Sequence, residues 1–182
     1  MSLYRHAVMA STVAREGQPG VIVTHPNRDK PVVRSTRVIV VALFLLSAVL
    51  VAVVTIGGWS VLEGAAPVEI GYVLVYLTLA FFAARWNRGV LPVGAALAVL
   101  LGIFALVAGP SWFARDKADF IQPSLNAGLL GVLTLLIVPA QILLVAFAMR
   151  GFNQGWNVEL ERRDPSGAGT GPVFVDAPPH PA

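Results

Sequence analysis

Apolar residues form four long runs along the chain, and polar residues gather between and outside these runs. A membrane-spanning helix needs about 20 mostly apolar residues, which each run approaches or exceeds. The runs cover residues 38–58, 68–84, 90–108 and 125–149. They are continuously apolar and lack the period-2 alternation of a membrane β-barrel strand. The pattern therefore predicts an all-α polytopic membrane protein, with four transmembrane helices in an up-down bundle.

Local signals predict where these helices begin and end. Gly109-Pro110 follows the third run, as expected where a glycine closes a helix and a proline prevents its continuation. Ser124 precedes the fourth run, where its hydroxyl is expected to cap the free N–H groups. Three tryptophans lie just outside the runs, at the depth where an amphipathic ring is favoured: Trp59, Trp86 and Trp112.

Composition agrees with a membrane location and excludes several kinds of site. The chain is 56% hydrophobic and 13% charged, with a mean hydropathy of +0.73. Soluble domains average roughly 45–50% apolar and about 25% charged residues, so half of the usual charge is missing. Cysteine is absent from the sequence. A disulfide framework, a catalytic thiol and cysteine-ligated metals are therefore excluded.

The remaining charges predict an orientation. If the chain crosses the membrane four times, eleven of its 13 lysines and arginines share one side: six before the first run, two between the second and third, and three after the fourth. Only Arg115 and Lys117 are left for the other side. Since positive residues stay on the cytoplasmic side, both termini are expected there. The abundance of Ala, Val, Gly and Arg hints at a GC-rich genome, so we expect a bacterial cytoplasmic membrane.

Polar tails flank the apolar region. The predicted segments are a cytoplasmic N-terminal tail over 1–36, a transmembrane domain over 37–150 and a cytoplasmic C-terminal tail over 151–182. The first tail is interpreted as flexible and basic, with a small hairpin between Val21–Val23 and Val32–Val33 as the alternative. From about residue 164 the chain is rich in proline and glycine, which predicts disorder.

The connection between the third and fourth runs mixes aromatic and charged side chains. Trp112, Phe113 and Phe120 alternate with residues such as Arg115 and Asp119. This pattern is typical of a short helix that lies in the membrane interface with its rings among the head groups. A docking surface for a partner is the alternative interpretation.

Few polar residues occur within the runs, and their spacing places them on common faces. At about 100° per residue, Tyr72 and Tyr76 fall within about 60° of Glu69 on the second run. On the fourth run Thr134 and Gln141 are seven residues apart, which is the repeat of a left-handed helix pair. Intramembrane polar groups usually face the bundle interior. The sequence therefore predicts one inward-facing polar cluster made of these five residues.

Two further features concern helix packing. Gly94, Ala98 and Gly102 recur every four residues on the third run, a pattern that lets two helix backbones approach closely. Pro139 lies in the middle of the fourth run and removes one helical hydrogen bond, so it is expected to kink that helix.

Glu69 is the one acidic residue near a predicted span. It lies within one turn of the predicted outer end, where it can reach water or pair with Arg115 or Lys117. The alternative is a proton or cation site, with Tyr72 and Tyr76 as hydrogen-bond partners. Because nothing titratable continues toward the cytoplasmic side, a relay would need further steps.

The residues needed for catalysis are missing from the predicted membrane region. All three histidines lie in the tails: His6, His25 and His180. We therefore expect no catalytic residue, no metal or cofactor site and no nucleic-acid partner. The favoured function is an accessory or scaffold subunit of a larger membrane complex, which implies the bilayer and a membrane-protein partner or a second copy as its contacts. The alternatives are a small oligomeric transporter or channel component that uses Glu69, and a lipid enzyme that borrows residues from a partner.

Overall fold

The computed structural model describes residues 13–14, 21–24, 28–115, 117, 121–156 and 160–163. The contacts divide the chain into two compact units. One unit, Asn27–Asn157, holds the helices, and the described strands belong to the other.

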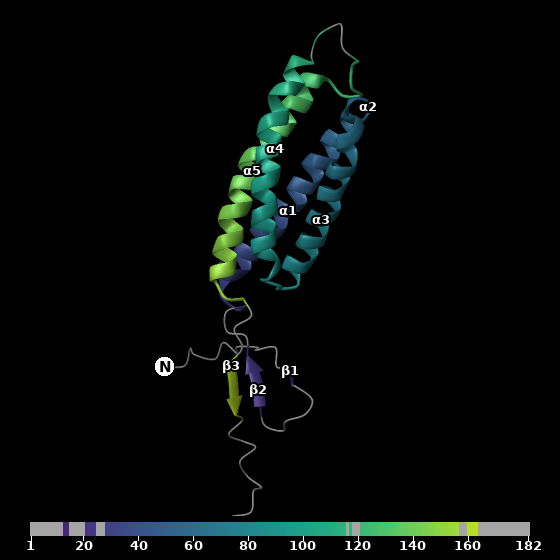
Figure 1. Ribbon diagram of the computed structural model, residues 1–182. Helices are drawn as coiled ribbons and strands as arrows, with labels where there is room; N and C mark the ends of the chain where they lie inside the picture. The colour runs from purple at the N-terminus through teal and green to yellow at the C-terminus, as the bar shows by residue number, and fades with distance from the viewer. Residues whose placement is uncertain are drawn as a thin grey trace, which may run out of the picture. The chain divides into compact units, whose positions relative to one another are not determined.

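Four long helices form the helical unit (Figure 1). They are α1 (Pro31–Gly57), α3 (Ala66–Ala84), α4 (Val90–Ala114) and α5 (Ala127–Asn153), with the short α2 (Trp59–Leu62) and the 3₁₀ turn Glu63–Ala65 between the first two. Each long helix is long and apolar enough to cross a membrane. The predicted all-α four-helix architecture is confirmed, and the chain is a multi-pass membrane protein.

Helix α1 begins at Pro31 and not at residue 38. Proline is favoured in the first turn because its fixed φ suits a helix and its missing N–H has no partner to lose there. Val33 is buried against the core, and Thr36 donates to the carbonyl oxygen of Val32 at 2.9 Å. Burial of Val33 and the continuity of the helix from Pro31 therefore override the β propensity of Val32 and Val33. The alternative hairpin that paired them with Val21–Val23 does not form.

Helix α4 continues past the glycine and proline that were predicted to end it. Pro110 lies inside the helix, and a Cβ on Gly109 would lie 2.5 Å from the Leu135 side chain. Gly109 thus permits close packing on α5 and does not cap α4. Trp112 is only 6% exposed because Gly58 makes room for its indole. The expected interfacial helix is therefore wrong at its start, where Trp112 and Phe113 belong to α4, and Asp116, Asp119 and Phe120 lie outside the described residues.

The cap of α5 is Asn126 and not Ser124. The backbone N–H of Leu129 donates to Oδ1 of Asn126 at 3.0 Å, which satisfies one free donor of the first turn. The preceding residue, Leu125, donates its N–H to the carbonyl oxygen of Gly57 at 3.1 Å. This bond ties the start of α5 to the end of α1, so the predicted cap was two residues too early.

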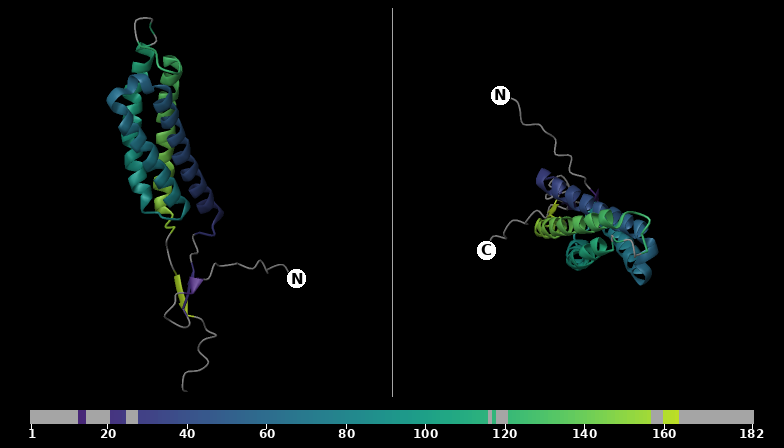
Figure 2. Two further views of the ribbon diagram at one scale, coloured as in Figure 1. Left: turned by 90° about the vertical axis from the view of Figure 1, so that its right-hand side faces the viewer. Right: turned by 90° about the horizontal axis from the view of Figure 1, so that it is seen from above.

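The helices pack in the order α3, α1, α5, α4, while α3 and α4 contact each other only slightly. The four lie side by side in both side views (Figures 1 and 2). The small residues of α4 lie on its packing face: Gly94, Ala98 and Gly102 are all buried. A Cβ on Gly94 would overlap the Phe44 ring of α1, whereas Gly102 faces Gln141 of α5. The small residues on this face of α4 thus allow close packing against both α1 and α5.

Large apolar side chains cover the outside of the bundle. Ile56 is 71% exposed, Val107 72% and Ile142 65%. In water such a surface would be unfavourable, whereas in a bilayer it contacts lipid chains that are equally apolar. The exposed apolar surface and the buried polar groups described below are what a lipid environment requires.

The second unit contains a three-stranded antiparallel sheet in the order β1-β2-β3. The strands are β1 (Val13–Ala14), β2 (Val21–Thr24) and β3 (Leu160–Arg163). Val23 is opposite Val13 on one side and Glu161 on the other. Val21–Val23 was thus correctly identified as β-prone, but its partners come from earlier and much later in the chain. The stretch from residue 164 onward lies outside the described residues.

The close contact at Gly94 predicts that even one added methyl group destabilises the bundle. Gly94→Ala should lower stability by about 1–3 kcal/mol because the methyl group overlaps the Phe44 ring. Gly71→Ala in α3 is the matched control, since a Cβ there meets nothing within 4 Å and alanine is the better helix former. Thermal unfolding in detergent measures both. Equal melting temperatures for the two variants would contradict this packing.

Candidate functional site

The predicted polar residues form two groups, and the deeper one is a closed hydrogen-bond network. The Tyr76 hydroxyl donates to Oε1 of Gln141 at 2.9 Å, and Nε2 of Gln141 donates to Oγ of Ser47 at 2.9 Å. Ser47 in turn donates to the carbonyl oxygen of Leu43 at 2.8 Å. The three side chains are 0–2% exposed. We call Ser47, Tyr76 and Gln141 the polar triad; it joins α1, α3 and α5.

Aromatic packing holds the triad in place. The Tyr76 ring meets the Phe44 ring edge to face, with centroids 5.5 Å apart, and the Tyr72 ring at 5.9 Å. Edge-to-face contacts are the favoured geometry of aromatic pairs. Tyr76 is therefore fixed both by its ring and by its hydroxyl. Each polar atom of the triad takes part in a hydrogen bond, so the triad stabilises the bundle.

Glu69 belongs to the second group, near the end of the bundle that carries α2. Its Oε2 atom lies 2.6 Å from the Thr55 hydroxyl of α1. The same hydroxyl lies 2.7 Å from the carbonyl oxygen of Val51, so its single hydrogen serves one of two acceptors at a time. Among the described residues no ion pair joins Glu69 to Arg115 or Lys117. Of the two states expected for Glu69, contact with water or an ion pair, the ion pair is replaced by a hydrogen bond from a neighbouring helix.

Thr134 and Tyr72 accompany Glu69 without bonding to it. Thr134 donates to the carbonyl oxygen of Leu130 one turn earlier in α5, at 2.8 Å. Tyr72 is half-buried and its ring packs against Phe104 of α4, with centroids 6.4 Å apart. Within the predicted cluster, the structure therefore joins only Tyr76 and Gln141 by a hydrogen bond.

A cavity of about 780 Å³ connects the members of this second group. Its wall includes Glu69 and Tyr72 of α3, Thr134 of α5 and, at the end of α4, Ser111 and Arg115. Most of the other lining residues are aliphatic or aromatic, such as Val51, Leu101, Phe104 and Ile137. We call this space the α3–α4 cavity, because residues of both helices line it and the two helices contact each other only slightly.

The polar triad lies just beyond the cavity. Ser47, Tyr76 and Gln141 are each one helical turn past a lining residue of the same helix, namely Val51, Tyr72 and Ile137. The triad therefore closes the cavity toward the other end of the bundle. The result is a blind, mostly apolar space with charged groups only at its α2 end.

Sequence reasoning missed two contributors to this region and expected a different contact for a third. Ser47 and Thr55 are the only hydroxyl residues of the run 38–58, and each bonds to a residue that was predicted to face inward. Their isolation in an apolar run was the available signal. Arg115 was expected to be an ion-pair partner for Glu69, and it lines the same cavity without forming that pair.

For the remaining predicted features, the structure shows where the residues lie but does not test the prediction. Pro139 lies inside α5, and the kink expected there stays a prediction. Within the described part of the chain, no three His, Cys, Asp or Glu side chains come together in a way that could hold a metal ion. Comparison of the chain with protein-family models, with curated proteins and with solved structures found no match.

The triad predicts strongly coupled effects of mutation. Gln141→Leu leaves the Tyr76 hydroxyl without its acceptor, and Tyr76→Phe removes the matching donor; each should cost about 1–2 kcal/mol. The double variant should cost clearly less than the sum, because no polar group is then left without its partner in this bond. Thr78→Val is the control, since that exposed hydroxyl bonds only within its own helix. Additive effects on detergent unfolding would contradict the coupling.

Proposed function

We propose that this chain is a non-catalytic accessory subunit of a larger membrane complex, and that its own task is to hold one long-chain amphiphile in the α3–α4 cavity. The observation that carries the proposal is the cavity itself. Its volume of about 780 Å³ falls within the range of about 300–1,000 Å³ that is usual for ligand sites. Its walls are largely apolar, as such sites require.

The order of polarity along the cavity fits a lipid-like molecule. Glu69, Ser111 and Arg115 lie toward the α2 end, and Leu101 and Ile137 lie deeper. A molecule in one leaflet has the same order, with a polar head at the interface and a chain that points to the bilayer centre. The triad then marks the depth at which the chain stops.

A side entrance supports uptake from the bilayer. A second hollow of about 220 Å³ is lined by Val68, Tyr72, Val75 and Leu97, among others, on α3 and α4. Val68 and Tyr72 line both spaces. Because α3 and α4 contact each other only slightly, an acyl chain can enter between them without first leaving the membrane.

The proposed orientation follows from the charges. With 11 basic residues on the side of the termini and two on the other side, both termini lie in the cytoplasm and the cavity opens toward the outer leaflet. The composition supports a bacterial cytoplasmic membrane.

A transporter that uses Glu69 is the second candidate, since this carboxylate lines the cavity. The closed triad beyond it weighs against a continuous path.

A bulky side chain in the cavity should displace the bound amphiphile. Ala108→Phe projects a ring into the lining of the cavity, whereas Ala96→Phe places the same ring on the exposed surface of the same helix. Native mass spectrometry after purification in mild detergent should find one amphiphile on the wild type and on Ala96→Phe, and about tenfold less on Ala108→Phe. The same spectra report a stoichiometric protein partner, if one is bound.

Two results would count against the proposal. Equal retention of the amphiphile by Ala108→Phe and Ala96→Phe would remove the cavity as its site. Recovery of the lone chain from cells that express it at native level would remove the accessory role. Unfolding temperatures of both variants show that a loss of binding is not a loss of the fold.

The orientation can be tested by labelling single cysteines, because the natural chain has none. Ser35, Ser60 and Ser111 are exposed, so each accepts a cysteine without repacking of the core. An impermeant maleimide applied to intact cells should label Ser60→Cys and Ser111→Cys, and should label Ser35→Cys only after lysis. Labelling of Ser35→Cys in intact cells would reverse the proposed orientation.

A further inference from the structure

Arginines and aromatic rings gather at the end of the bundle opposite to α2. The Arg37 guanidinium lies 4.2 Å from the centroid of the Trp86 ring, and that of Arg28 lies 5.7 Å from it. Trp86 also meets Trp156 edge to face, with centroids 5.8 Å apart. Arg88, in the same turn as Trp86, lies 4.8 Å from the Phe152 ring of α5. We call these six residues the arginine cluster.

The backbone holds Trp86 in an unusual position. Its φ of 66° is the only positive value among the described non-glycine residues. A left-handed residue just after a helix is normally glycine, so the packing around this indole has to hold it there. Trp156 is 0% exposed and is the ring against which it packs. The cluster is thus a fixed arrangement and not a set of loose surface side chains.

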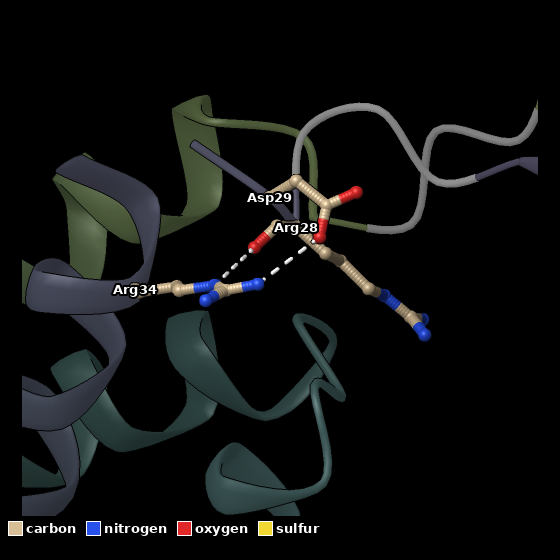
Figure 3. A network of polar contacts seen from close by, with 3 residues as sticks. All are labelled: Arg28, Asp29 and Arg34. Atoms are coloured by element: carbon tan, nitrogen blue, oxygen red, sulfur yellow. Dashed lines mark hydrogen bonds and ion pairs between the residues drawn. The ribbon is translucent and has the colours of Figure 1, made fainter. Parts of the chain in front are cut away.

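Among the residues that the structure describes, basic side chains outnumber acidic ones at this end of the bundle. The described residues here include seven basic side chains: Arg28, Lys30, Arg34, Arg37, Arg85, Arg88 and Arg150. Asp29 is the one acidic side chain described at this end, and it pairs with Arg34 at 3.1 Å. Figure 3 shows this pair, with the Arg28 guanidinium directed away from it. Neither Arg37 nor Arg88 forms an ion pair with a carboxylate of the described residues, so both can offer their charge to an external anion.

We propose that Arg37 and Arg88 bind the phosphate of an anionic phospholipid head group. Both are fixed to the turn between α3 and α4, because Arg88 belongs to it and Arg37 donates to the carbonyl oxygen of Ala84 at 2.8 Å. Stacking on an aromatic ring occupies the face of a guanidinium and leaves most N–H donors at its edge. Arginine recognises phosphate through that edge, with paired hydrogen bonds.

A purely topological role explains the charges but not their arrangement. Retaining a segment on the cytoplasmic side requires only the number of basic residues. It does not require that guanidiniums stack on Trp86 and Phe152 or that a tryptophan adopt a left-handed conformation. Because these side chains are already ordered, they lose less conformational entropy when a head group binds. The cluster shares no residue with the α3–α4 cavity, so either proposal can fail without the other.

Binding of defined lipids to the full chain tests the inference. The protein in detergent is titrated with phosphatidylglycerol, with phosphatidylcholine of the same chain length and with inorganic phosphate, and native mass spectrometry measures the bound fraction. The wild type should bind phosphatidylglycerol about tenfold more tightly than phosphatidylcholine, and Arg37→Gln/Arg88→Gln should lose this preference. Lys117→Gln, at the other end of the bundle and outside the lining of the α3–α4 cavity, should keep it.

A second variant separates guanidinium recognition from net charge. Arg37→Lys/Arg88→Lys keeps both charges but loses the planar donors, so it should bind phosphatidylglycerol more weakly than the wild type does. Unfolding temperatures measured without lipid establish that each variant is folded. Equal affinity for the two lipids, an unchanged preference in the double glutamine variant or an equal loss in Lys117→Gln would overturn the site. Competition by inorganic phosphate at the same concentration would overturn the assignment to a lipid.

Discussion

The bundle depends on the hydrogen bonds that Gln141 makes with two other helices. In the hydrocarbon core of a bilayer there is no water to form hydrogen bonds with a polar group, so each polar group needs a hydrogen-bond partner within the protein. Gln141 accepts from Tyr76 and donates to Ser47, and thereby joins α5 to α3 and to α1. Within the described part of the chain no buried side-chain nitrogen or oxygen atom lacks a partner. Apolar contacts alone could be exchanged for contacts with lipid, whereas these bonds could not.

The same network determines where the functional space ends. Between the α2 end and the triad, α3 and α4 leave the cavity that Glu69 and Arg115 border. Beyond the triad the helices are packed by Phe44, Leu91 and Leu144, all fully buried. The two proposed lipid sites therefore lie at opposite ends of the bundle. The two proposed sites would thus bind lipid through different chemistry, mainly apolar at one end and cationic at the other.

The sequence predicted the spans well because the thickness of the bilayer sets the length of an apolar run. It also identified Tyr76 and Gln141 as inward-facing, since helical periodicity places each on the polar face of its own helix. Which residues then meet depends on which helices are neighbours, and periodicity within one helix cannot show that. Ser47 and Thr55 were for this reason overlooked as partners. Gly109 was misread because a glycine that permits close packing and a glycine that ends a helix look alike in sequence. Trp112 was misplaced as a consequence, because α4 continues beyond this glycine.

The bundle is built from two helical hairpins, α1 with α3 and α4 with α5, and Gln141 supplies their polar connection. During synthesis the first hairpin emerges before α5 exists. Until then the hydroxyl of Tyr76 lacks its acceptor, and the face of α1 that will contact α5 meets lipid. A chain without α5 therefore differs from the finished chain at the Tyr76 hydroxyl, whose acceptor Gln141 is missing. When α5 has been synthesised, Gln141 bonds to both Tyr76 and Ser47 and stabilises the packing of α3 against α1.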